Sequence, residues 1–101
     1  MSIDVSVIIV NWNVRELLRA CLQSLRDAAG LPMDRLQVIV VDNASADDSA
    51  DMVRREFPEA ILMANEDNLG FGRANNQALP VCVGRHVLLL NPDTLVEEDT
   101  F

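Results

Sequence analysis

The sequence predicts an α/β fold, a Rossmann-like three-layer arrangement in which helices cover both faces of a mostly parallel sheet. Short continuous apolar runs alternate with stretches of helical periodicity, which is the pattern of repeated strand–helix units. The chain has 101 residues, half of them hydrophobic and 24% charged. This length and balance are expected of one ordered globular domain.

Four apolar runs are expected to form the strands. They cover residues 5–10, 36–41, 60–63 and 85–90. All four are short and rich in aliphatic side chains, as expected of strands that are buried in a parallel sheet.

The first helix is expected directly after the first strand. Apolar side chains recur every three or four positions over residues 14–25, and Asn13 with Glu16 three residues later predicts a capping box. Gly30 and Pro32 are expected to end this helix.

Two further helices follow the second and third strands. Ser45, with Asp48 three residues later, predicts the start of the second helix, and Pro58 is expected to end it. The third helix is expected from Arg73 to about residue 83, with Pro80 ending or kinking it early.

The charge of the chain excludes one class of partner. The formal net charge is −8, and all eight basic residues are arginines that are scattered along the sequence. Because no basic stripe is present, nucleic-acid binding is not expected. An anionic ligand would need a metal ion or local hydrogen-bond donors to approach such an acidic chain.

The two cysteines and the absence of long apolar runs indicate where in the cell the protein is expected. Cys21 and Cys82 form no C-x-x-C pair and are expected to be reduced core thiols. No run reaches the ~18 apolar residues of a membrane span, and the N-terminus lacks a signal pattern. A cytoplasmic location is expected, with membrane association supplied only by parts outside this chain.

Small polar or acidic residues follow three of the expected strands. Asn11 follows the first strand, Asp42-Asn43 the second and Asn91-Pro92-Asp93 the fourth. Ligands of open α/β sheets bind at the edge where the strands end. Asp42 and Asn43 together suit the edge of a pyrimidine base, although either could simply cap a turn.

The glycine-containing segment 70–73 offers a second candidate contact. Gly70 would let the backbone approach a ligand closely, and Arg73 could pair with a diphosphate at the start of a helix. The segment lacks the third glycine of G-x-G-x-x-G, because position 75 is Asn75. A tight turn with a solvated arginine is the simpler alternative.

Asp93 is the candidate metal ligand. Mg²⁺ or Mn²⁺ commonly takes one or two protein oxygens while phosphates and waters complete the shell. The alternative is that Asp93 caps a following helix. Trp12 could support a base pocket by packing, but a lone Trp at this place is also compatible with a purely structural role.

Four ordered motifs carry a resemblance to a known family. Residues 10–13 (VNWN), 41–45 (VDNAS), 68–76 (NLGFGRANN) and 90–94 (LNPDT) together resemble family 2 glycosyltransferases, most closely the rhamnosyltransferase-like branch. The resemblance implies a GT-A fold. It also implies that residues 1–101 are the nucleotide-sugar-binding portion, truncated before the acceptor-binding half.

The resemblance assigns roles to particular residues. Asp42 would contact the base, Arg73 would lie near the diphosphate, and Asp93 would match the last acid of the D-x-D motif. Asn91 stands where that motif has its first acid. The candidate donor-binding residues are Val10, Asn11, Asp42, Asn43, Gly70, Arg73 and Asn91, and the candidate metal ligand is Asp93.

The implied activity is inverting transfer of a sugar, hexosyl or rhamnosyl, from a UDP- or dTDP-sugar to an acceptor hydroxyl with Mg²⁺ or Mn²⁺. The acceptor would be a carbohydrate or a lipid-linked molecule of cell wall or polysaccharide biosynthesis. The general base would lie beyond Phe101, so no catalytic residue is assigned here and the isolated fragment is expected to be inactive.

A non-catalytic nucleotide-binding or regulatory module is the alternative from a different class. Receiver-type phosphoacceptor domains also carry acids at strand ends, but they resemble a pattern with an essential lysine, and this chain has no lysine. Self-association through an open sheet edge is a further expectation.

Overall fold

The four expected strands form one sheet in the computed structural model, which describes residues 3–28 and 36–93. They are β1 (Val5–Asn11), β2 (Leu36–Asp42), β3 (Ile61–Ala64) and β4 (His86–Leu90), in the order β3-β2-β1-β4. Every pairing among them is parallel. The α/β class is confirmed, and each strand lies within one residue of its predicted bounds.

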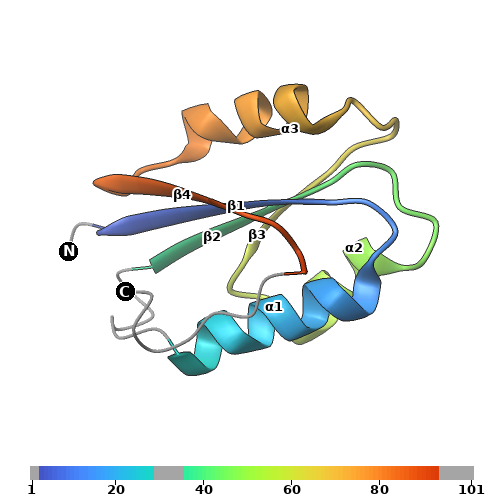
Figure 1. Cartoon of the computed structure of the whole chain (residues 1–101), viewed down its shortest axis with the longest axis horizontal. Coiled ribbons are helices and arrows are strands. Elements are labelled where there is room, and N and C mark those ends of the chain that lie inside the picture. The colour runs from blue at the N-terminus through green and yellow to red at the C-terminus, as the bar shows by residue number, and fades with distance from the viewer. Residues whose placement is uncertain (1–2, 29–35, 94–101) are drawn as a thin grey trace.

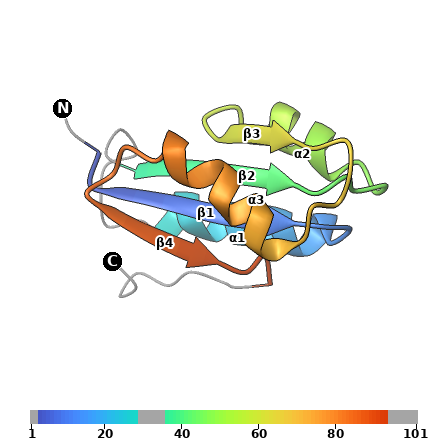
Figure 2. The ribbon, with the colours of Figure 1, turned by 90° about the horizontal axis from the view of Figure 1, so that it is seen from above.

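Helices cover both faces of this sheet. α1 (Arg15–Ala28) and α2 (Ser49–Glu56) lie on one face, and α3 (Phe71–Ala78) lies on the other (Figure 1). α3 runs antiparallel to the strands, so its first turn lies near the edge where the strands end (Figure 2). The predicted three layers are therefore confirmed.

The ends of the helices follow the proline signals where these are described. α2 ends at Glu56, before Pro58, and α3 gives way at Leu79–Val81 to a short 3-10 turn that contains Pro80. The predicted helix end at Gly30 and Pro32 lies outside the described residues. None of the helices that the structure describes is long and apolar enough to cross a membrane.

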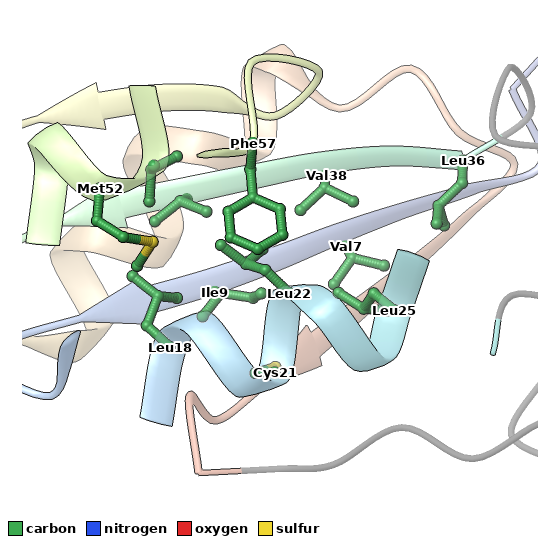
Figure 3. Close-up of a cluster of buried hydrophobic side chains, with 12 residues drawn as sticks. Val7, Ile9, Leu18, Cys21, Leu22, Leu25, Leu36, Val38, Met52 and Phe57 are labelled. Atoms are coloured by element: carbon green, nitrogen blue, oxygen red, sulfur yellow. The ribbon is translucent and has the colours of Figure 1, made fainter. Parts of the chain in front are cut away.

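The larger hydrophobic core lies between the sheet and helices α1 and α2 (Figure 3). Leu18, Leu22 and Leu25 form one apolar stripe of α1, which packs on alternate residues of β1 and β2. Met52 of α2 and Phe57 directly after it complete the cluster. Full burial contributes about 1.5–3 kcal/mol for each large apolar side chain, so this face carries most of the hydrophobic stabilisation.

The opposite face is covered by α3 through small side chains. The cluster there consists of two helix alanines and three strand residues: Ala74, Ala78, Ile8, Ile39 and Val41. On β4, Val87 and Leu89 alternate with the residues that face α1, and both are exposed. α3 therefore covers only part of its face of the sheet.

Gly84 fixes the chain at the edge where the strands begin. A Cβ on Gly84 would lie 2.5 Å from the backbone N of Ser6, so only glycine fits there. The N–H of Gly84 donates to Ser6 Oγ at 2.8 Å, and Ser6 Oγ donates in turn to Gln37 Oε1 on β2. These contacts hold the entry into β4 against β1.

The predicted capping of α1 is wrong. Asn13 has a left-handed backbone (φ 53°), and its Oδ1 accepts the N–H of Ala46 at 2.7 Å. At the start of α1, the N–H of Arg15 instead donates to Asp47 Oδ2 at 2.9 Å. A residue from the loop after β2 therefore takes the role that the sequence pattern assigned to Asn13.

The predicted start of α2 is also wrong. The helix begins at Ser49, four residues after Ser45, and Asp48 stands before it with a left-handed backbone (φ 65°). Ser45 bonds the loop around β1 and β2 rather than a helix terminus.

Candidate functional site

Because the strands are parallel, the chain leaves all of them at the same edge of the sheet (Figure 2). Asn11 of β1 pairs in register with Asp42 of β2. β4 lies on the other side of β1, so the end of β4 is about 10 Å from the end of β2 at the usual strand spacing. The predicted site residues on three strands thus come to one edge.

Asp42 is held by internal hydrogen bonds. Its side chain is 3% exposed. Its carboxylate accepts Asn11 Nδ2 at 3.0 Å, Ser45 Oγ at 2.6 Å and the N–H of Ser45 at 3.1 Å. A carboxylate offers about four acceptor positions, so these donors leave about one for a ligand. Asp42 therefore anchors the turn after β2, as the capping alternative expected.

The loops after β1 and β2 are joined by hydrogen bonds to the hydroxyl group of Ser45. Ser45 Oγ accepts the N–H of Asn13 at 2.9 Å, and Asn11 Nδ2 also approaches it at 3.3 Å. Asn11 is fully buried, and its Oδ1 is a buried acceptor without a partner among the described residues. Val10, the residue before it, is partly buried beside the α3 cluster.

Asp47 ties the same loops to the two helices of that face. Partial burial acts to raise the pKa of Asp47, but hydrogen bonds from Ser49 and from the N–H of Arg15 outweigh it and hold the pKa below its usual range. The charge of Asp47 is therefore favoured by its position between the starts of α1 and α2.

Asn43 connects the end of β2 to the loop that precedes α3. Its side chain is 2% exposed, and Nδ2 donates to the carbonyl of Gly70 at 3.2 Å. Its Oδ1 accepts Asn65 Nδ2 at 3.0 Å. Both functional groups of Asn43 are used internally, so this residue shapes the site through the loop.

Gly70 and Arg73 lie at the start of α3. Gly70 has a positive φ of 81°, and a Cβ there would meet nothing within 4 Å, so its neighbourhood is open. Arg73 is exposed and has no hydrogen bond or ion pair among the described residues. Its guanidinium is therefore free to pair with an anion at this edge.

Asn91 and Asp93 are exposed after β4, and with Pro92 they line an open hollow of about 280 Å³ against Val14 and Leu17. Burial first, and then the negative charge of Asp93, raise the pKa of the Cys21 thiol to about 11. Both Cys21 and Cys82 are free thiols; Cys21 is buried in the core as predicted, whereas Cys82 is only partly buried.

The described residues contain no group of three or more His, Cys, Asp or Glu side chains that could hold a metal ion. Asp93 is an exposed single carboxylate, which fits a Mg²⁺ or Mn²⁺ ion held jointly with ligand phosphates. It does not fit an ion held by a closed cage of protein ligands.

Two exposed aromatic side chains lie at this edge, and of these Trp12 was considered from the sequence whereas Phe71 was missed. Trp12, directly after β1, and Phe71, the first residue of α3, are each 56% exposed. An exposed aromatic ring can stack on a planar ligand. The signal for Trp12 was its position between two polar residues at a strand end.

Comparisons with known proteins agree with this arrangement. Residues 6–101 match the family Glycosyl transferase family 2. The chain is 32% identical over 101 residues to the minor teichoic acid biosynthesis protein GgaB of Bacillus subtilis (strain 168), covering 97% of this chain and 11% of GgaB.

Two solved structures superpose closely. The mannosyltransferase PcManGT from Pyrobaculum calidifontis, in complex with GDP-Man and Mn²⁺, gives a TM-score of 0.88 at 30% identity, covering 99% of this chain and 30% of that one. S. aureus TarS 1–349 in complex with UDP-GlcNAc gives a TM-score of 0.87 at 27% identity, covering 97% of this chain and 29% of that one.

Proposed function

Because the chain belongs to glycosyl transferase family 2 and has the GT-A fold of its structural neighbours, we propose that it supplies donor and metal binding to an inverting glycosyltransferase. The observation that carries the proposal is the meeting of the four motifs at one edge of a parallel sheet. The family membership favours this function over a non-catalytic regulatory module.

The donor would lie along the edge from β2 to β4. Asp42 would accept an N–H of the base at its remaining lone pair, and Trp12 would offer its exposed ring to the base. Val10 and Asn11 would line this part of the site. The partial positive charge at the start of α3 and the unpaired guanidinium of Arg73 would favour the diphosphate.

A divalent ion at Asp93 would offset the charge that develops on the nucleoside diphosphate leaving group. Asp93 would hold this ion, Mg²⁺ or Mn²⁺, with Asn91 nearby. A net charge of −8 supports this role, because the chain would otherwise repel a diphosphate.

The donor class follows from what the neighbours contain. PcManGT is in complex with GDP-Man and Mn²⁺, and TarS with UDP or UDP-GlcNAc. For this chain the proposed donor is a nucleoside diphosphate sugar, with UDP- or dTDP-hexose or rhamnose as the narrower choice. The acceptor would be a carbohydrate or lipid-linked hydroxyl in cell wall or polysaccharide biosynthesis, on the cytoplasmic side of a membrane.

The catalytic base would stand in an acceptor-binding half that follows Phe101. The chain spans 30% of PcManGT and 11% of GgaB, which leaves room for such a half in proteins of this family. The base would deprotonate the acceptor hydroxyl as it attacks the sugar.

A thermal-shift panel tests donor and metal binding. We expect UDP, GDP or dTDP at a hundred times its Kd to add about 2.7 kcal/mol of stability, and the shift to require Mn²⁺. Asp93→Ala should abolish the metal-dependent part. The exposed carboxylate of Asp51 on α2 provides the matched control, Asp51→Ala. A shift without Mn²⁺ that survives Asp93→Ala would refute the metal assignment.

A further inference from the structure

Two side-chain amides on separate elements bond each other in both directions. Asn65 Nδ2 donates to Gln77 Oε1 at 2.9 Å, and Gln77 Nε2 donates to Asn65 Oδ1 at 2.8 Å. Asn65 directly follows β3 and Gln77 lies on α3. We name this pair of residues the amide clasp. It fixes the helix to the end of the sheet.

The amide clasp continues into the centre of the sheet. Asn65 Nδ2 also donates to Asn43 Oδ1 at 3.0 Å, and the N–H of Asn65 donates to the carbonyl of Asp42 at 2.9 Å. Asn43 in turn donates to the carbonyl of Gly70 at 3.2 Å. The loop from Asn65 to Gly70 is thereby held at both of its ends.

The apolar contacts of α3 are poorly suited to fix its rotation. α3 has eight residues, and the side chains that it buries are those of Ala74, Asn75 and Ala78. An alanine methyl does not interlock with a sheet as a longer side chain does. The amide clasp therefore provides the directional contact that sets how α3 is turned about its axis.

Gln77 shares a face of α3 with Arg73. The two residues are four positions apart, so their side chains lie one above the other on the helix. Arg73 is the one nearer the edge where the strands end. Arg73 has no hydrogen bond or ion pair of its own among the described residues, so its direction depends on how the helix is turned.

We infer that Gln77 is a positioning residue for donor binding. It would not touch the donor, but through Asn65 it sets the direction in which Arg73 leaves α3 and hence the strength of the contact between Arg73 and the diphosphate. This inference rests on the proposed function, because it requires an anionic group at Arg73.

The test is a double-mutant cycle in the full chain with Gln77→Met and Arg73→Ala. Methionine keeps the length and helix propensity of Gln77 but removes both bonds of the amide clasp. Kd is measured by calorimetry for UDP, GDP and dTDP with Mn²⁺. Asn76→Ala is the control, because Asn76 is the exposed neighbour on the same helix.

We expect Gln77→Met to weaken binding of the tightest diphosphate about three- to tenfold, and to weaken it no further once Arg73→Ala is present. Asn76→Ala should leave Kd unchanged. Gln77→Leu removes the same two bonds without adding a charge, so it should weaken binding to the same extent as Gln77→Met, and it serves if Gln77→Met does not fold.

The outcomes separate the two proposals. An unchanged Kd in Gln77→Met, alongside weaker binding in Arg73→Ala, would overturn the inference and leave the proposed function in place. Equal weakening by Gln77→Met with and without Arg73 would also overturn it, because Gln77 would then act on the fold as a whole. If none of the three diphosphates binds the unmodified chain, both proposals fail.

Discussion

Removing the carboxylate of Asp42 should cost the chain a large part of its folding stability. In Asp42→Ala, Asn11 Nδ2 stays fully buried with only the 3.3 Å approach of Ser45 Oγ, and both donors of Ser45 lose their acceptor. A bond to a charged acceptor contributes about 1.5–3 kcal/mol. Because half-buried Ser45 can turn to water, we expect a total loss of about 3–5 kcal/mol.

Urea unfolding followed by circular dichroism measures this loss. Domains of this size have about 5–15 kcal/mol in total, and each kcal/mol shifts Tm by roughly 4–8 °C, so Tm should fall by at least about 12 °C. Asp51→Ala, which removes one exposed carboxylate from α2, should change stability by less than about 0.5 kcal/mol.

A loss below about 1 kcal/mol in Asp42→Ala would refute the reasoning, because the carboxylate would then not hold the turn. Ser45→Ala offers an independent check, since it removes the hydroxyl bond to Asp42 and leaves the bonds from the backbone N–H of residue 45 and from Asn11. Its loss should be smaller than that of Asp42→Ala. Nucleotide binding by Asp42→Ala and Ser45→Ala must be measured at a temperature at which both variants are folded.

Four other predictions concern stability, pH, thiol reactivity and activity. Gly84→Ala should destabilise by about 2–4 kcal/mol in urea unfolding, because the new methyl would meet the backbone of Ser6; wild-type stability would contradict the close approach. Burial acts to raise the pKa values of Asp47 and Glu59, but hydrogen bonds outweigh it and lower both. The stability that these two carboxylates add is therefore complete at pH values above their ordinary pKa values of 3.8 and 4.5, and it is lost as the pH falls below about 4. A denaturation midpoint that rises on acidification to pH 3 would oppose this sign. At pH 8 a thiol reagent should leave Cys21, with its pKa of about 11, unmodified until the chain unfolds; rapid native labelling would contradict its burial. The isolated 101 residues with Mn²⁺ and a UDP-sugar should release no UDP above background in the presence of an acceptor, and measurable transfer would refute the placement of the base beyond Phe101.

The sequence predicts the strands well because their signal is local. A run such as residues 38–41 is apolar at every position, which is typical of a strand buried on both faces of a parallel sheet. The order of the motifs also placed the candidate residues on one edge. Whether Asp42 and Asp93 contact one ligand stays a prediction.

The helix starts failed because the capping residues had better partners far away in the sequence. Asn13 and Ser45 fit local capping rules, yet each bonds the loop of the other: Ser45 Oγ accepts the N–H of Asn13, and Asn13 Oδ1 accepts the N–H of Ala46. Glu16 pairs with Arg15 and Arg19 rather than with the backbone of Asn13.

The amide clasp was invisible to sequence patterns for the same physical reason. An asparagine and a glutamine twelve positions apart have no periodic signature, and their pairing depends on how α3 lies over the sheet. The exposure of Trp12 likewise follows from the direction of the chain after β1. Such features require the fold before they can be recognised.

Because the two faces of the sheet are covered unequally, the α3 side is expected to be less stable locally than the side covered by α1 and α2. α1 and α2 are anchored by long aliphatic side chains, whereas α3 rests on two methyl groups and a few amide contacts. Local opening is easiest where little apolar surface is buried, so amide protons of α3 should exchange with solvent well before those of β1 and β2. Arg73 lies on α3, so an anion bound to Arg73 would slow amide hydrogen exchange in the helix that otherwise opens most readily.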